Sequence, residues 1–473
     1  MAQLSSQIFL CPGAATPQAG ANDAQSRVVG LPEILRELFQ HCEAPALASC
    51  ARVCKTWNVH SVPLIWENID AQQAIFGPLR WNSEAIGRPT FENLSLLSRI
   101  FSYTKWTKHL HIRIRKGTDL EYNTMKEFIL AASLFRRPHF PRLTELIYEA
   151  DDSLVLKTLL YWLSPRLLKL DLRVTILCPN PSTDLILQTL HEHAPHLVSL
   201  RLNLPFGASI NPLSDNLSSS IHGLTHLEGF RAKWSLVFEP GVWKTLASLP
   251  NLKSMEIFWS SENEDHPIWE KALLPWDVDD PFPTLENIDG VIFTYLVPQV
   301  FGVRGMCNLR HIKLTAVDVP SELTIQTIFQ TIPTYYSQLE TFSVSVHHWE
   351  FPRHDLSTFL SKNLKTFSLV TATPIVITPD AFVAFIQHHP GLLSLTLAHQ
   401  HRQCPDTASL TFDILPHVLE ACPSLRELRI SLQGQPYSMS LRREKIQKLC
   451  VVKGLQLNVK DAKAEESAAL QEG

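Results

Sequence analysis

The residues whose types and spacing could hold a metal ion lie close to residue 400. His399 and His401 flank Gln400, and Cys404 follows three residues later. Imidazole and thiolate groups are zinc ligands, but a zinc site needs ligands that converge in a fixed geometry. This cluster comes directly after an expected strand and is therefore expected in a loop. The sequence favours exposed loop histidines there, and we predict no metal site.

The sequence contains none of the common catalytic signatures. It has no G-x-S-x-G, no G-x-x-x-x-G-K-[ST], no G-x-G-x-x-G and no H-E-x-x-H. The nine cysteines are scattered and never spaced as Cys-x-x-Cys, which indicates neither a zinc site nor a disulfide framework. We therefore predict no catalytic residues, no cofactor and no enzymatic activity.

Composition describes a globular chain with ample apolar surface for a core. Hydrophobic residues make up 45% and charged residues 19%, and the formal net charge is −4. A near-neutral balance argues against a general nucleic-acid binder, which should be basic. No stretch approaches the roughly 18 apolar residues of a membrane span, and the first 26 residues lack Lys and Arg. We expect a cytoplasmic or nuclear protein without nucleic-acid or membrane partners.

One apolar pattern, L-x-x-L-x-L or a close variant, recurs along most of the chain. The clear copies begin at Leu143, Leu167, Leu197, Leu227, Leu252, Leu285, Leu309, Leu339, Leu364, Leu392 and Leu425. Their starting positions differ by about 28 residues on average, which is the range of leucine-rich repeats. Seven copies carry a proline two residues earlier, as Pro165 does before Leu167, where it ends a preceding helix.

The segments between the copies are mostly helical in pattern, for example 184–194 and 380–389. One strand and one helix per unit cannot bury their apolar residues alone, whereas stacked parallel units can. The predicted fold is therefore α/β: a curved leucine-rich-repeat solenoid with its strands on the concave face and its helices on the convex face.

The polar residues between the leucines should face the concave surface, because side chains alternate along a strand. On the early repeats this alternation brings together several cations and one aromatic ring, and we predict a substrate-binding patch for an acidic or phosphorylated segment. Its residues are Arg173, Arg201, Arg231, Lys233 and Phe258. In the alternative interpretation, Asp171, Glu256 and solvent neutralise these cations.

A short helical stretch with surplus apolar surface precedes the repeats, at residues 31–66. One helical stripe comprises Ile34, Leu35, Leu38, Phe39 and Cys42. A second stripe runs from Leu47 to Trp57. A unit of under 40 residues cannot bury all of this surface within itself, so the rest of the chain or a partner must cover it.

These residues also carry a family resemblance. Leu-Pro at 31–32, Val-Cys-Lys-x-Trp at 53–57 and Pro-Leu-Ile-Trp at 63–66 resemble an F-box, and the repeats resemble the degenerate leucine-rich repeats found behind F-boxes. Cys42 and Ile65 depart mildly from the usual leucines. The resemblance implies docking on the Skp-type adaptor of an SCF ubiquitin ligase, and through it on a cullin. The expected adaptor-binding residues are Leu31, Pro32, Ile34, Leu35, Leu38, Phe39, Val53, Trp57, Leu64 and Trp66.

The resemblance further implies a substrate receptor whose solenoid captures a protein for ubiquitylation. One alternative is a leucine-rich-repeat interaction scaffold without a role in ubiquitylation, and another is a regulator of a nucleotide-hydrolysing partner. The stretch at 31–66 could also be a helical cap on the domain that follows.

The sequence divides into five predicted segments. These are a disordered arm at 1–26, the F-box at 27–70, a helical connector at 71–105, the solenoid at 106–460 and a disordered tail at 461–473.

Overall fold

The structure is a computed structural model of the chain. It describes residues 31–76, 91–114, 125, 128–129, 140–175, 181–204, 211–259, 280–302, 306–318, 324, 327–346, 356, 359, 363–371, 377–399, 410–430, 439–442 and 444–446. The chain falls into two compact units, Met1–Leu227 and Glu228–Gly473. The predicted arm at 1–26, the tail at 461–473 and the histidine–cysteine cluster beyond His399 lie outside the described residues.

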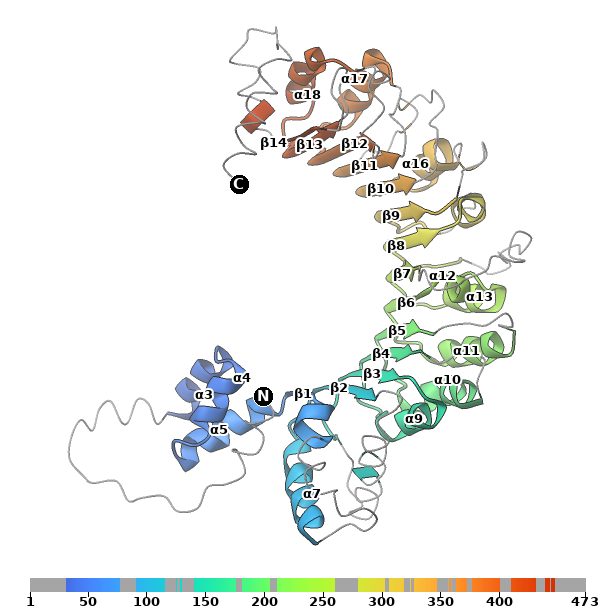
Figure 1. Cartoon of the computed structure of the whole chain (residues 1–473). Helices are drawn as coiled ribbons and strands as arrows, with labels where there is room; N and C mark the ends of the chain where they lie inside the picture. The colour runs from blue at the N-terminus through green and yellow to red at the C-terminus, as the bar shows by residue number, and fades with distance from the viewer. Residues whose placement is uncertain are drawn as a thin grey trace, which may run out of the picture. The chain divides into compact units, whose positions relative to one another are not determined.

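The first unit begins with three helices, α3 (Pro32–Gln40), α4 (Ala44–Cys50) and α5 (Lys55–Ile65) (Figure 1). Pro32 occupies the first helical turn of α3, where its missing N–H costs nothing, and Glu33 follows it at the positive helix end. The helices enclose a small core of Leu35, Phe39 and Leu47. The helical period expected for the first stripe is therefore present.

The three helices lead into a mixed connection. It consists of β1 (Asn68–Asp70), the π-helical turn η1 (Gln72–Phe76) and α7 (Phe91–Thr104). Trp66, which ends α5, stacks on Tyr103 of α7 with 5.2 Å between the ring centroids. Strand β1 lies before the expected start of the solenoid, and it pairs in parallel with the first repeat strand.

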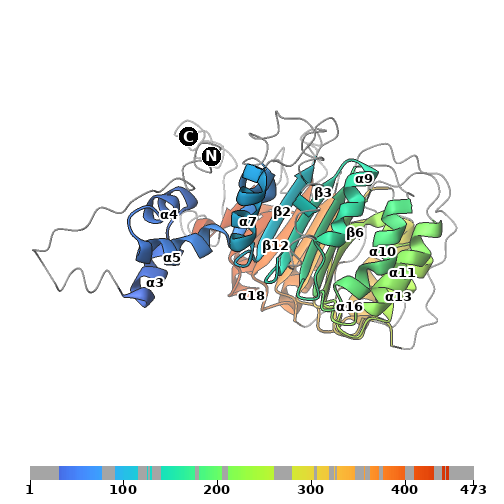
Figure 2. The same cartoon turned by 90° about the horizontal axis from the view of Figure 1, so that it is seen from below.

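The repeats of the first unit form parallel strands in chain order. The strands are β2 (His109–Ile114), β3 (Glu145–Ala150), β4 (Lys169–Val174) and β5 (Ser199–Asn203). The helices between them are α9 (Ser153–Lys157), η2 (Thr158–Tyr161), α10 (Pro181–His193) and α11 (Asn211–Gly223). Figure 2 shows α9, α10 and α11 on one side of the strands of this unit.

The second unit continues the same strand–helix alternation. Its strands are β6 (Gly229–Lys233), β7 (Ser254–Phe258), β8 (Asn287–Ile292), β9 (His311–Ala316), β10 (Thr341–Val346), β11 (Thr366–Thr371), β12 (Ser394–His399), β13 (Glu427–Ile430) and β14 (Met439–Arg442). All neighbouring pairs are parallel except β13 with β14, which is antiparallel.

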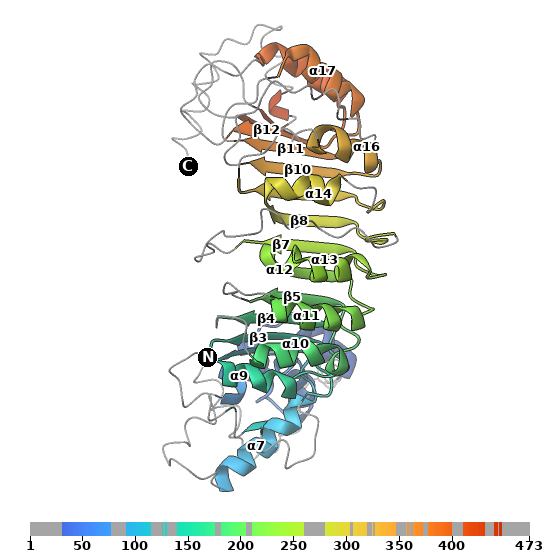
Figure 3. The same ribbon diagram turned by 90° about the vertical axis from the view of Figure 1, so that its right-hand side faces the viewer.

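Helical segments follow most strands of the second unit. They are α12 (Trp234–Val237), α13 (Pro240–Ala247), η4 (Thr294–Leu296), α14 (Val297–Phe301), η5 (Thr327–Thr331), α16 (Ile332–Tyr335), α17 (Pro379–His388), η7 (Phe412–Ile414) and α18 (Leu415–Ala421). In Figure 3 the helices of this unit lie in front of its strands, and in Figure 1 no helix that the structure describes in this unit lies on the opposite strand face. We call that opposite face the uncovered face.

The leucine pattern sets the register of every repeat. In all eleven clear copies the strand begins two residues after the first leucine, as β4 does after Leu167. That leucine is fully buried, and its N–H donates to the carbonyl of Ser164 three residues earlier, which closes a turn. The next two apolar residues, Leu170 and Leu172, point into the core. The predicted α/β class with a leucine-rich-repeat solenoid is confirmed.

Within the part of the chain that the structure describes, no helix combines the length and the apolar character that crossing a bilayer requires.

Candidate protein-interaction surfaces

The helical unit of α3, α4 and α5 exposes large apolar side chains to solvent. Leu31 is 46% exposed, Leu38 54%, Val53 61% and Val59 58%. Across the described residues only three other large hydrophobic side chains are comparably exposed. A short helical unit that holds four of seven such residues has the composition of a docking surface.

The backbone of this unit places two of these residues on one helix face. Leu31 is the N-cap residue of α3, and Leu38 lies seven residues later, which is two helical turns. Val53 lies in the turn between α4 and α5, where its N–H donates to the carbonyl of Cys50. The side-chain amide of Asn58 donates to the carbonyl of Ala51 at 2.9 Å and so ties α5 to that turn.

The ten expected adaptor-binding residues divide into three groups in the structure. Leu31, Pro32, Leu38 and Val53 are exposed, and Ile34, Trp57 and Leu64 are half-buried. Leu35, Phe39 and Trp66 are buried within the chain, with exposed fractions of 0%, 3% and 5%. Leu35 and Phe39 form the inner side of the helical stripe, and Trp66 packs on Tyr103 of α7, so in this conformation these three support the surface and do not line it.

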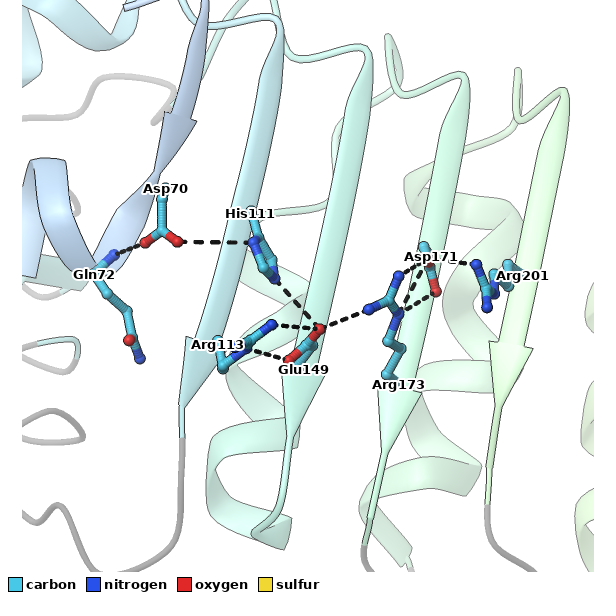
Figure 4. A network of polar contacts seen from close by, with 8 residues as sticks. All are labelled: Asp70, Gln72, His111, Arg113, Glu149, Asp171, Arg173 and Arg201. Atoms are coloured by element: carbon cyan, nitrogen blue, oxygen red, sulfur yellow. Dashed lines mark hydrogen bonds and ion pairs between the residues drawn. The ribbon is translucent and has the colours of Figure 1, made fainter. Parts of the chain in front are cut away.

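The uncovered strand face of the first unit carries a network of ion pairs (Figure 4). Arg113 on β2 and Arg173 on β4 both donate to the carboxylate of Glu149, which lies between them on β3. The register explains the contact, because Glu149 is paired directly with Arg113 on one side and Arg173 on the other. His111 completes the cluster, with its Nε2 atom 3.4 Å from Glu149 Oε1.

Two pKa shifts follow from this network. Burial raises the pKa of Glu149, but the hydrogen bond and charge of Arg113, together with His111 and Arg173, outweigh it and leave the pKa below its ordinary value. The pKa of Arg173 is raised, chiefly by its hydrogen bond to Asp171 and further by the charge of Glu149. Both groups are therefore held in their charged forms.

Among the predicted substrate-binding residues of the first unit, Arg173 is already engaged by carboxylates. It donates to Asp171 at 2.7 Å and to Glu149 at 2.8 Å. Arg201 lies opposite Asp171 on β5, with 3.5 Å between Arg201 Nη1 and Asp171 Oδ2. The geometry matches the alternative interpretation, in which neighbouring carboxylates neutralise the cations.

The predicted residues of the second unit show a similar arrangement. Arg231 forms a 2.8 Å ion pair with Glu256, and its guanidinium lies 5.6 Å from the ring centre of the half-buried Phe258. Lys233 differs from the expectation, because it is only 5% exposed. Lys233 is both the last residue of β6 and the N-cap residue of α12, which begins at Trp234, and its side chain is buried at this turn.

The sequence interpretation missed the part of the first network that lies on β1, β2 and β3. Asp70 and Arg113 lie on β1 and β2, before the first clear copy of the leucine pattern, and Glu149 lies on β3, directly after the last apolar residue of that copy. The alternation of polar and apolar residues across 109–114 could have placed His111 and Arg113 on the uncovered face, but it gives no sign of Asp70 or Glu149.

No metal centre is apparent in the described ranges, which contain no group of three or more His, Cys, Asp or Glu side chains able to hold an ion. His401 and Cys404 lie outside those ranges.

Comparison with known proteins identifies the helical unit. Residues 32–72 match the sequence model of the F-box-like family. The chain therefore contains an F-box-like domain, followed by leucine-rich repeats. No curated protein matches the chain.

Two solved structures show limited similarity to the chain. The TLR13–ssRNA13 complex is 13% identical with a TM-score of 0.35, and the match covers 70% of this chain but only 45% of that chain. The Rad7 and Elc1 complex in yeast is 15% identical with a TM-score of 0.34, and the match covers 88% of this chain and 94% of that chain.

Proposed function

We propose, from the F-box-like domain at residues 32–72, that this chain is a substrate receptor of an SCF-type ubiquitin ligase. The domain would dock on a Skp-type adaptor and through it reach a cullin. The repeats would capture a protein substrate. The chain itself would make and break no bond, and tethering would raise the effective concentration of the substrate near the ubiquitin-transfer machinery.

The exposure of Leu31, Leu38 and Val53 is the observation that carries this proposal. Each apolar side chain that a partner covers contributes to binding, at about 25 cal/mol for each Å² removed from water. The buried residues Leu35 and Phe39 would hold α3 in place beneath that surface. We therefore divide the expected adaptor-binding residues by role. The exposed residues would contact the adaptor, and the buried residues would hold the exposed ones in position.

The uncovered strand face would serve as the capture surface. In the first unit it presents charges that already satisfy one another, which favours recognition by complementary polar groups over attraction of a strongly charged partner. The predicted patch of Arg173 and Arg201 would accept an acidic group only in competition with Asp171 and Glu149.

Co-expression with a Skp-type adaptor and a cullin tests the proposal. We expect the full chain to elute with both proteins as one complex in size-exclusion chromatography. A well-folded chain that elutes alone would contradict the ligase role. Binding to the adaptor without recruitment of the cullin would favour the alternative, an interaction scaffold that acts outside ubiquitylation.

A further inference from the structure

The uncovered face of three strands in the second unit carries hydroxyl groups in place of charges. Two rows cross β10, β11 and β12 in register: Thr341, Thr366 and Ser394 form one row, and Ser343, Ser368 and Thr396 form the other. All six side chains are half-buried, and the residues between them along each strand point into the core. We call these six residues the hydroxyl rows.

The hydroxyl rows are free to bind another molecule. Within the described part of the chain, none of the six hydroxyls hydrogen-bonds to a side chain or to the backbone. A serine or threonine hydroxyl can both donate and accept a hydrogen bond, so the rows offer both functions to a partner. Covering them also requires no charge to be desolvated, in contrast to the ion pairs around Glu149.

One cation flanks the second row at each end. Lys313 of β9 is paired in register with Ser343, and Arg429 of β13 is paired in register with Thr396. Lys313 lies 3.3 Å from Asp289, but this pair is too exposed, at 65% and 52%, for the contact to hold the lysine strongly. Arg429 is exposed and has no ion pair within the residues that the structure describes.

This arrangement favours a protein segment over other partners. Nucleic acid would need cations that match a run of phosphates, and the three central strands have none on this face. A membrane surface would need exposed apolar or aromatic side chains, and Phe342 and Phe367 are turned into the core. A peptide backbone supplies the donors and acceptors that hydroxyl groups match.

The spacing sets the length of that segment. Lys313 and Arg429 lie four strand positions apart, which at about 4.8 Å for each position is roughly 19 Å. An extended chain rises about 3.3 Å for each residue, so about six residues separate the points above the two cations. We infer that the hydroxyl rows bind an extended segment of the substrate in which uncharged polar residues separate two acidic side chains about six residues apart. This inference rests on the proposed capture role of the repeats.

Two pools of capped synthetic peptides test this inference. Both have random Ser, Thr, Asn, Gln, Gly and Ala between two end residues about six positions apart; one pool has Glu at both ends and the other has Lys. The measured quantity is the amount of each peptide pool that the immobilised full chain retains. We expect about tenfold greater retention of the Glu pool, and loss of that preference in Lys313→Glu/Arg429→Glu. The matched control, Lys157→Glu/Lys244→Glu on the helices, should keep it.

A second variant separates binding at the rows from simple charge attraction. Ser368→Phe leaves both cations in place and adds bulk at the centre of the rows, at a strand position that accepts an aromatic residue. We expect it to lower retention of the Glu pool about tenfold while the thermal unfolding midpoint stays unchanged. Equal retention of both pools, or retention that neither variant alters, would overturn the inference.

Adaptor binding is scored on the same samples, so that the two proposals fail separately. A chain that binds the adaptor but does not prefer the Glu pool would contradict only the inference about the hydroxyl rows. A chain that prefers the Glu pool but binds no adaptor would support the inference about the hydroxyl rows and contradict the proposed ligase role.

Discussion

Trp57 of α5 packs edge-on against Phe39 of α3, with 5.3 Å between the ring centroids and 70° between the ring planes. Edge-to-face pairs of this kind contribute about 0.5–1.5 kcal/mol beyond the burial of their area. The contact joins α3 to α5, and Phe39 belongs with Leu35 and Leu47 to the core against which Trp57 packs. Trp57 therefore stabilises the packing of α5 on α3, the helix that carries the exposed Leu38, without contacting a partner.

Replacing Trp57 with alanine should loosen the helical domain. The change removes the ring that packs on Phe39 and leaves a cavity beside a small core, and we expect a loss of about 2–3 kcal/mol in local stability. Hydrogen exchange of α3 and α5 measures this loss. Val59→Ala on the same helix serves as the control, because Val59 is 58% exposed. Equal protection in the two variants would show that the aromatic contact is unimportant.

Glu149→Gln should destabilise the first unit at neutral pH. The amide cannot balance Arg113 and Arg173, which would remain half-buried beside each other. We expect a loss of about 1–2 kcal/mol in the free energy of unfolding, measured by urea denaturation. Glu192→Gln, at an exposed position on α10, should change the free energy by less than about 0.5 kcal/mol.

The destabilisation by Glu149→Gln should also depend on pH. The pKa of Glu149 is lower in the folded chain than its ordinary value of 4.5. The charged Glu149 side chain therefore contributes its full stabilisation to the free energy of unfolding above pH 4.5. That stabilisation is lost as the pH falls through the lower pKa that Glu149 has in the folded chain. The gap between the native chain and Glu149→Gln should be present at neutral pH and shrink as the pH falls below about 4.5. A gap that widens as the pH falls below about 4.5 would contradict this sign.

Gly290→Ala should disrupt the pairing of β7 with β8. Gly290 has φ of +145°, which side-chain-bearing residues rarely adopt, and an added Cβ would lie 1.8 Å from the carbonyl oxygen of Ile257. Relieving that overlap requires the backbone to move, and we expect a loss of at least about 3 kcal/mol. Gly391→Ala is the matched control, because its added Cβ meets nothing within 4 Å. Similar melting temperatures for the two variants would refute this account.

The repeats were predictable because one rule governs them all. Each copy of the leucine pattern buries its first leucine and starts a strand two residues later, so Leu167 and Leu392 alike give the strand position and the inward face. Alternation then assigned Asp171 and Arg173 correctly to the uncovered face. Local sequence was sufficient wherever the same hydrophobic burial recurs in every unit.

The features that escaped prediction depend on pairing between strands. Nothing in the sequence near Glu149 reveals that β2 and β4 place Arg113 and Arg173 on either side of it. The alternation of side chains along β6 predicts that Lys233 faces the same side as Arg231. The chain turns into α12 at this point, however, and Lys233 is buried. The helical pattern of 31–66 likewise could not separate buried Leu35 from exposed Leu38, because that distinction depends on how α3 packs on α5.

The central claim is that exposed apolar residues of the F-box-like domain bind a Skp-type adaptor. Isothermal titration of the purified adaptor into the full chain tests it most directly, with Leu38→Glu/Val53→Glu as the variant and Glu37→Gln/Glu192→Gln as the control. A charge buried at an apolar contact is strongly unfavourable, so we predict at least a hundredfold rise in Kd for the variant. The control should keep the native Kd, and hydrogen exchange should show both proteins folded. Unchanged affinity in the folded variant would contradict the account.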